Sequence, residues 1–220
     1  MTLDFSVVTN AWQALAWGVV GTMLLAVFGM ALAMVIGVGG VAVLRAQRRI
    51  PTLLVTAFVE VVRNTPFLVQ IYFIFFALPF AGIRLNPTIT AILALGLNGG
   101  AYAIEIIRGG VESIPKGQTE AGLALGLHRG EVFRMIVLKP ALKAIYPSLS
   151  SQFILLTLTT AICTSISAYE LTSVGQRIEA ETCRSFEVYF TLTGIYLVIS
   201  LLTMWALAAI GRQAFAYPDR

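Results

Sequence analysis

Very few residues of this sequence have the types and spacing that covalent or metal chemistry requires. The chain contains no His-Glu-x-x-His zinc pair, no Gly-x-Ser-x-Gly nucleophile turn and no Gly-x-x-x-x-Gly-Lys-Ser/Thr phosphate loop. His128 is the single histidine, which is too few for a metal site built on histidines. We therefore expect a protein that is not an enzyme, has no catalytic residue, and binds neither ATP nor another cofactor itself.

Several polar residues lie inside long apolar segments, where each polar group must be hydrogen-bonded or reach water. Thr157, Thr160 and Thr164 are three and four residues apart, so an α-helix would place them on one face. Asn98 carries an amide with donor and acceptor groups, and Tyr102 lies one turn further along. These residues are candidates to line a solute pathway. The alternative is packing, because threonine hydroxyls can bond to the carbonyl one turn back, Asn98 can bridge two helices, and Tyr102 suits a membrane interface.

Two charged pairs with a spacing of three residues lie close to ends of the apolar segments. Glu105 and Arg108 form one pair, and Glu60 and Arg63 form the other. Residues three apart share a helix face and can make an ion pair. A charge at the membrane centre costs about 2.5–3.5 kcal/mol, which favours a place near the interface. We expect each pair to brace the cytoplasmic end of its own helix rather than to contact a solute.

The composition indicates that lipid rather than water is the main solvent. Hydrophobic residues make up 58% of the chain and charged residues 12%, against about 45–50% and about 25% in soluble domains. The net charge of +4 comes from basic residues scattered between apolar segments, so no nucleic-acid partner is expected. A transmembrane helix needs about 20 mainly apolar residues. Five segments meet this length: Trp12–Leu44, Thr52–Phe80, Pro87–Ile107, Ala144–Ser167 and Val188–Gly211.

These segments predict an all-α, polytopic membrane protein with five transmembrane helices in a single domain, residues 1–220. Lysine and arginine are enriched in the connections after the first segment, between the third and fourth, and after the fifth. Cytoplasmic loops carry the excess of these residues in membrane proteins. We therefore expect the N-terminus outside and the C-terminus in the cytoplasm.

The long cytoplasmic connection, residues 108–143, is predicted to contain a short helix at 118–127. Pro115 ends the preceding helix, and Gly126 helps to end the short one. A helix of this length is marginal in water, so it must pack against something. Its small residues permit close approach, its leucines supply apolar contact, and its glutamate suits the helix dipole. The residues expected to contact a partner are Glu120, Ala121, Gly122, Leu125 and Gly126.

The run Glu120-Ala121-Gly122, followed by Gly126, resembles the EAA loop of ABC-importer permeases, where it forms the coupling helix. Further motifs make the chain similar to the permeases for polar amino acids of the histidine, glutamine, arginine and opine type. These motifs are Val61-Val62-Arg63-Asn64-Thr65-Pro66, Gly100-Ala101-Tyr102, Glu105-Ile106-Ile107-Arg108-Gly109-Gly110, Ser113-Ile114-Pro115-Lys116-Gly117-Gln118 and Glu170-Leu171-Thr172.

The resemblance implies a type I importer core of five transmembrane helices in a bacterial inner membrane. In such importers two permease subunits enclose a shared pathway. Each coupling helix lies in a groove of one of two ATP-binding cassette subunits, which bind ATP and Mg²⁺. A periplasmic solute-binding protein delivers a polar amino acid or related small solute, and the pathway alternates between outward and inward access. Membrane lipid surrounds the subunits.

The sequence departs from the family pattern at two places, and the second of them bears on the assembly. The proline of the usual Leu-Pro-Gln-Ala-Leu-Arg is displaced by one position, at Pro140, which changes where the helix break points. The usual Lys-Asp-Thr-Ser is replaced by Leu158-Thr159-Thr160-Ala161, so an intramembrane charge pair is missing. We therefore favour a heterodimer, with solute recognition carried more by the other permease, over a homodimer.

A stand-alone secondary transporter or channel is the alternative function. Proton or ion coupling normally leaves carboxylates or histidines deep in the membrane. In this chain the deep segments contain hydroxyls and an amide instead. Dependence of transport on an ATPase separates the two functions.

Overall fold

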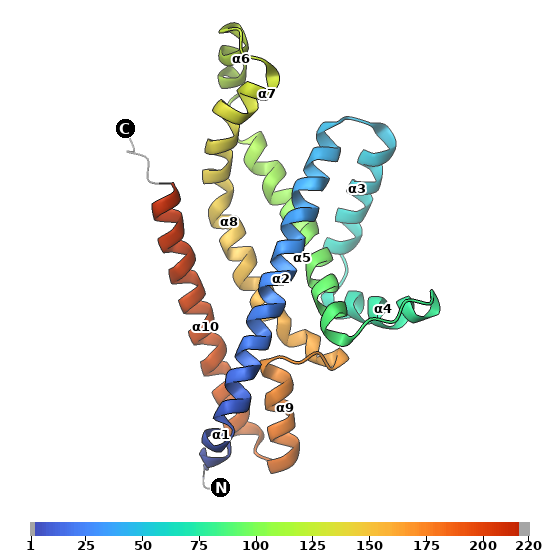
Figure 1. Cartoon of the computed structure of the whole chain (residues 1–220), viewed down its shortest axis with the longest axis vertical. Helices are drawn as coiled ribbons and strands as arrows, with labels where there is room; N and C mark the ends of the chain where they lie inside the picture. The colour runs from blue at the N-terminus through green and yellow to red at the C-terminus, as the bar shows by residue number, and fades with distance from the viewer. Residues whose placement is uncertain (1–2, 216–220) are drawn as a thin grey trace.

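The computed structural model describes residues 3–215, and every regular element in that range is a helix. The predicted all-α class is therefore confirmed, while the predicted domain limits, 1–220, reach beyond the described residues. Figure 1 shows an elongated bundle with α1 at one end and α6 at the other. The elements are α1 (Ser6–Asn10), α2 (Trp12–Arg45), α3 (Arg49–Arg63), α4 (Phe67–Phe80), α5 (Pro87–Glu112), α6 (Lys116–Ala124), α7 (Arg129–Val132), η1 (Phe133–Val137), α8 (Leu138–Thr159), η2 (Thr160–Ile166), α9 (Leu171–Thr182) and α10 (Ser185–Ala214).

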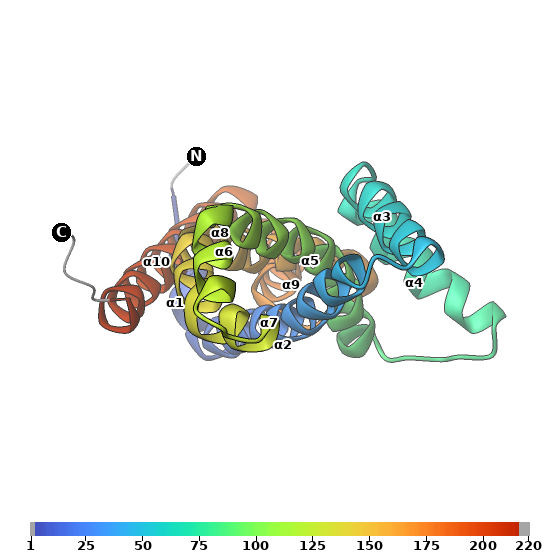
Figure 2. The same cartoon turned by 90° about the horizontal axis from the view of Figure 1, so that it is seen from above.

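Four helical stretches of the described chain are long and apolar enough to cross a membrane: α2, α5, the run 129–166 that contains α8, and α10. A fifth span arises when α3 and α4 are counted together. In the view from above, α10 lies on one flank and α3 with α4 on the opposite flank, with α2, α5 and α8 between them (Figure 2). The predicted number of spans therefore depends on how the α3–α4 pair is counted.

The predicted continuous helix at 52–80 is wrong, because α3 and α4 meet at an angle of 113°. The break falls at Pro66, whose ring disfavours helical geometry at the preceding residue and which has no N–H to donate. The amide of Gln70 satisfies the carbonyls that the break frees, donating from Nε2 to Val62 O at 2.7 Å and to Thr65 O at 2.9 Å. A break inside lipid requires such internal partners, because no water replaces the lost bonds.

The fourth and third predicted segments also differ from the structure at their ends. The helix predicted from 144 is assigned from Leu138, where it continues directly from the π-helix η1, so Pro140 lies inside one helical run, 129–166. It changes to a 3₁₀ helix after Thr159, and η1 before it is a π-helix. The helix predicted to end at Ile107 continues to Glu112. The first and last long helices are closer to prediction: α2 ends one residue later than the predicted 12–44, and α10 exceeds the predicted 188–211 by three residues at each end.

The helices α2 and α5 pack along a seam where glycines replace side chains. A Cβ atom at Gly37 would lie 2.7 Å from the Ala103 Cβ, and one at Gly100 would lie 2.7 Å from Ile36 Cγ2. Real Cβ atoms do not approach other carbons this closely, so only glycine fits these positions. Small residues of this kind let transmembrane helices approach closely, which membrane packing needs in place of a hydrophobic driving force.

Candidate coupling helix and solute pathway

The predicted short helix of the cytoplasmic connection is α6, which runs over Lys116–Ala124 rather than 118–127. It ends early because Gly126 adopts a φ of 84°, the left-handed conformation that glycine tolerates best. The Leu127 N–H donates to Gly122 O at 3.2 Å, and the Gly126 N–H donates to Leu123 O at 3.0 Å. These two hydrogen bonds together form the Schellman motif, which satisfies the last free carbonyls of a helix.

One face of α6 is held tightly against the chain that follows it. Gly122 is buried, and a Cβ there would lie 2.6 Å from Ile136 Cδ1 and 3.0 Å from Val132 Cγ2. The remaining predicted contact residues point away from that support. Glu120 and Ala121 are exposed, and Leu125 is 81% exposed. The structure therefore presents an unburied leucine at the C-cap of α6, and α6 lies at one end of the bundle (Figure 1).

Asn98 bridges two helices through Gln70, a residue that the sequence analysis did not single out. The Asn98 Nδ2 donates to Gln70 Oε1 at 3.0 Å, while the Gln70 Nε2 satisfies the broken turn after α3. The amide of Asn98 is thus tied to the α3–α4 break. The signal that could have identified Gln70 is a lone amide just after a proline in an apolar run.

A chain of charged and aromatic contacts continues along the same face of α5, one and two turns beyond Asn98. The Arg63 guanidinium lies 5.4 Å from the centre of the Tyr102 ring and 3.5 Å from Glu105. Glu105 also accepts from Arg108 at 2.8 Å, which confirms that predicted pair. The predicted Glu60–Arg63 pair is not formed, because Arg63 reaches across to α5 instead. This crossing fixes α3 against α5 on the same side as Asn98.

The three threonines do not share a face, and the prediction that they do is wrong. Thr160 and Thr164 both lie in η2, and in a 3₁₀ helix residues four apart are rotated by about 120°, instead of about 40° in an α-helix. Thr157 and Thr160 are buried, and their hydroxyls donate to Phe153 O and Thr157 O. Thr164 is half-buried and bonds to Gln176 Oε1 at 3.0 Å.

A buried carboxylate lies at the opposite end of the bundle from α6, at the start of α9. Glu170 accepts hydrogen bonds from the N–H groups of Thr172 and Ser173, at 2.8 and 2.6 Å, and from the Tyr196 hydroxyl at 2.9 Å. Burial raises the pKa of the Glu170 carboxyl, and these donors oppose that rise. The cluster fixes α9 against α10. In the sequence Glu170 belongs to the family motif Glu170-Leu171-Thr172, and its spacing to Ser173, which is that of a capping box, is the signal that could have identified this cluster.

Comparison with known proteins decides between the two transport functions. Residues 29–215 match the family described as binding-protein-dependent transport system inner membrane component. The chain belongs to this family. It is therefore a non-catalytic permease subunit of an ABC importer in the bacterial inner membrane, and such importers work with an ATPase and a solute-binding protein. The alternative of a stand-alone transporter or channel finds no support.

Individual relatives span nearly the whole permease. The glutamine transport system permease protein GlnP of Escherichia coli (strain K12) is 37% identical, covering 97% of this chain and 98% of the relative. The L-cystine transport system permease protein TcyB of Bacillus subtilis (strain 168) is 34% identical, covering 94% and 88%. The octopine transport system permease protein OccM of Rhizobium radiobacter is 34% identical, covering 92% and 86%.

Solved structures agree with the fold. A crystal structure of an amino acid ABC transporter with histidines matches with a TM-score of 0.91 and 29% identity, covering 97% of this chain and 100% of the other. An inward-facing MetNI methionine ABC transporter matches with a TM-score of 0.70 and 22% identity, covering 94% and 95%, which shows the fold alone. The predicted type I permease fold is confirmed by the first match.

Proposed function

We propose that this permease imports a polar amino acid or a related small solute and receives its driving force through α6. The observation that carries the coupling is Leu125, an 81% exposed leucine at the C-cap of α6, a helix that Gly122 packs against Val132 and Ile136. A helix that is packed against the rest of the permease can pass on a movement of its partner. An exposed apolar side chain is stabilised when it is buried in a groove of that partner. Glu120, Ala121 and Gly126 complete this contact surface. ATP and Mg²⁺ are bound by the partner ATPase.

The solute class rests on the relatives and on the polar groups that face one another across the helices. The named relatives transport glutamine, cystine and octopine, which all carry an amino acid moiety. We assign Asn98, Tyr102 and Thr164 to the pathway, because all three side chains are only partly buried. Gln70 joins them as the partner of Asn98. The full burial of Thr157 and Thr160 supports the packing alternative, so the proposal leaves them out.

The proposed assembly contains two permease subunits, two ATP-binding cassette subunits and a periplasmic binding protein. The missing charge pair at 158–161 leads us to favour a heterodimer in which the other permease carries more of the solute recognition. The proposed orientation places α6 in the cytoplasm and α9 outside. The excess of Lys and Arg around α6 and after α2 supports it.

Uptake into vesicles tests the proposed function. The complex that co-purifies with this chain is reconstituted with its binding protein, and accumulation of radiolabelled glutamine, arginine, histidine and octopine is measured. We expect accumulation of one of these classes only when ATP and Mg²⁺ are present on the side of α6. Accumulation that follows a proton or sodium gradient without ATP would disprove the proposal.

The same assay tests the pathway residues. Asn98→Leu removes a hydrogen-bonding amide, and a lost hydrogen bond of about 1 kcal/mol corresponds to a half-saturation concentration raised about fivefold. Thr159→Val is the matched control, since Thr159 bonds only to its own helix at Leu155 O in the described chain. Equal half-saturation constants for the Asn98 variant and the control would remove Asn98 from the pathway.

A further inference from the structure

Three cavities meet at the side chain of Arg45, beneath the coupling helix. Their volumes are about 580, 380 and 330 Å³, and Arg45 lines all of them. The first lies between the ends of α2 and α5 and the start of α6, and the second lies between α2, α5 and α8. None of these cavities contains Asn98, Tyr102 or Thr164. They therefore form a separate site from the proposed solute pathway.

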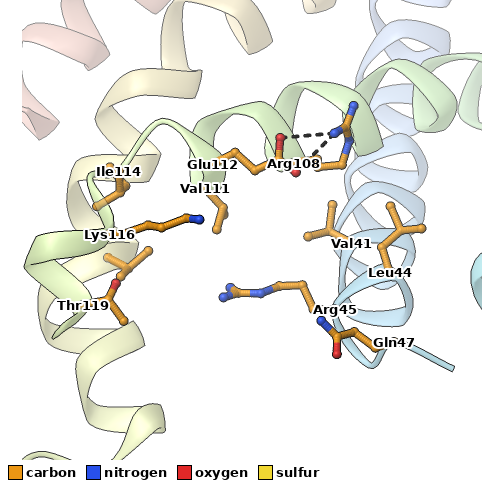
Figure 3. A pocket seen from close by; sticks show the side chains of 11 residues that line it. Val41, Leu44, Arg45, Gln47, Arg108, Val111, Glu112, Ile114, Lys116 and Thr119 are labelled. Atoms are coloured by element: carbon orange, nitrogen blue, oxygen red, sulfur yellow. Dashed lines mark hydrogen bonds and ion pairs between the residues drawn. The ribbon is translucent and has the colours of Figure 1, made fainter. Parts of the chain in front are cut away.

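The largest of these three cavities has both polar and apolar walls, and its lining carries an excess of positive charge. Figure 3 shows Arg45 from α2 and Lys116 from α6 extending into it from opposite walls, with Thr119 beside Lys116. Arg108 is turned toward Glu112, at 3.2 Å, and also pairs with Glu105. Within residues 3–215 no carboxylate forms an ion pair with Arg45 or Lys116. Glu112 is the carboxylate of this lining and pairs with Arg108, so Arg45 and Lys116 converge on the cavity without a carboxylate partner of their own in the described chain.

The guanidinium of Arg45 is held in position at this junction. Its central carbon lies 5.0 Å from the centre of the Phe133 ring, within the range of a cation–π contact. That contact leaves the N–H groups of Arg45 free to donate to an anion. Arg129 lines the third cavity beside Phe133 and adds a further positive charge nearby.

The second cavity is an apolar groove that continues from the first cavity into the membrane-spanning part of the bundle. Val41, Arg45 and Val111 line both, and Arg45 is the only polar residue among those that line the groove. The groove runs past Val38 on α2 and Ile145 on α8, inside spans that are long and apolar enough for lipid. An elongated apolar ligand with an anionic head would satisfy both cavities together.

We propose that these joined cavities bind one anionic phospholipid from the leaflet that faces α6. Its phosphate lies between Arg45 and Lys116, and one acyl chain lies in the apolar groove. Basic pockets at the ends of transmembrane helices bind such headgroups, and each Lys or Arg near a membrane surface attracts anionic lipid. Because Arg45 is the last residue of α2 and Lys116 is the first residue of α6, the bound lipid links the membrane bundle to the coupling helix.

Binding of fluorescent phosphatidylglycerol to the purified complex in neutral detergent tests this site. At about 1 kcal/mol per basic residue, Arg45→Gln and Lys116→Gln should each weaken binding about fivefold, and the double variant about thirtyfold. Arg48→Gln is the matched control, because it removes the same charge three residues away without lining any of the three cavities. A loss as large in the control would show general surface attraction and overturn the proposal.

A further variant tests lipid binding through the apolar groove without changing the charge of the site. Val38 is 57% exposed and lines only the apolar groove of these three cavities, so Val38→Trp should fill the groove without unfolding α2. We expect weaker binding of phosphatidylglycerol and no competition from inorganic phosphate or glycerophosphoglycerol at matched concentration. Unchanged lipid binding in Val38→Trp, or full competition by either headgroup compound, would show a phosphate site and contradict the lipid assignment.

Discussion

Replacing Leu125 by glutamate should release the permease from its ATPase. Leu125 is 81% exposed in the described chain, so its substitution disturbs no internal packing. In a partner's groove the new carboxylate would be buried without a counter-charge. Loss of a central interface anchor costs at least about 2 kcal/mol, which corresponds to about thirtyfold weaker association. Co-purification from mild detergent and the ATPase activity of the eluted complex measure the effect.

The control for Leu125→Glu is Ile50→Glu, at the start of α3. Ile50 is 73% exposed and has the same apolar character, but it lies on a different helix from α6. We expect this variant to retain the ATPase. If Leu125→Glu retains as much ATPase as the unchanged chain, α6 is not the coupling element.

Replacing Gly37 by valine should destabilise the helix bundle, whereas the same change at Gly39 should not. A Cβ at Gly37 would lie 2.7 Å from the Ala103 Cβ, but one at Gly39 would meet nothing within 4 Å. Both glycines lie in α2, so the change in helix propensity is similar. Overpacking of a tight contact costs about 1–3 kcal/mol. The Tm of the complex in detergent should fall for Gly37→Val alone.

Equal values of Tm for the two variants would contradict the packing of α2 against α5. A fall in both would instead indicate that the valine itself disturbs α2. The pair is informative because only the contact to α5 differs between the two positions.

The spans could be predicted from sequence because length and apolar content are local properties. α2 and α10 needed only a count of apolar residues against the thickness of a bilayer. The break between α3 and α4 could not be predicted from such a count. Residues 52–80 form one apolar run by composition, and hydropathy does not register that Pro66 turns the chain by 113°. The bend is stable because Gln70 satisfies the freed carbonyls, and that role depends on three-dimensional placement.

Contacts within one helix could be predicted from the sequence, whereas contacts between helices could not. The Glu105–Arg108 pair followed from spacing, whereas the contact between Arg63 and Glu105 joins two helices and leaves no trace in local sequence. The prediction that the three threonines share one face was wrong because it assumed a continuous α-helix, whereas the chain forms a 3₁₀ helix after Thr159. The bounds of α6 shifted because Lys116 follows Pro115 directly and the helix starts there.

A crosslink from position 125 tests the central claim most directly. A benzophenone is attached to Leu125→Cys in a chain with Cys183→Ser, since Cys163 is buried and does not react. Glu181→Cys, on α9 at the opposite end of the bundle, is the control (Figure 1). If α6 is the coupling element, we expect light to join position 125, and not position 181, to the co-purified ATPase. No crosslink from position 125, or equal crosslinking from both, would contradict coupling through α6.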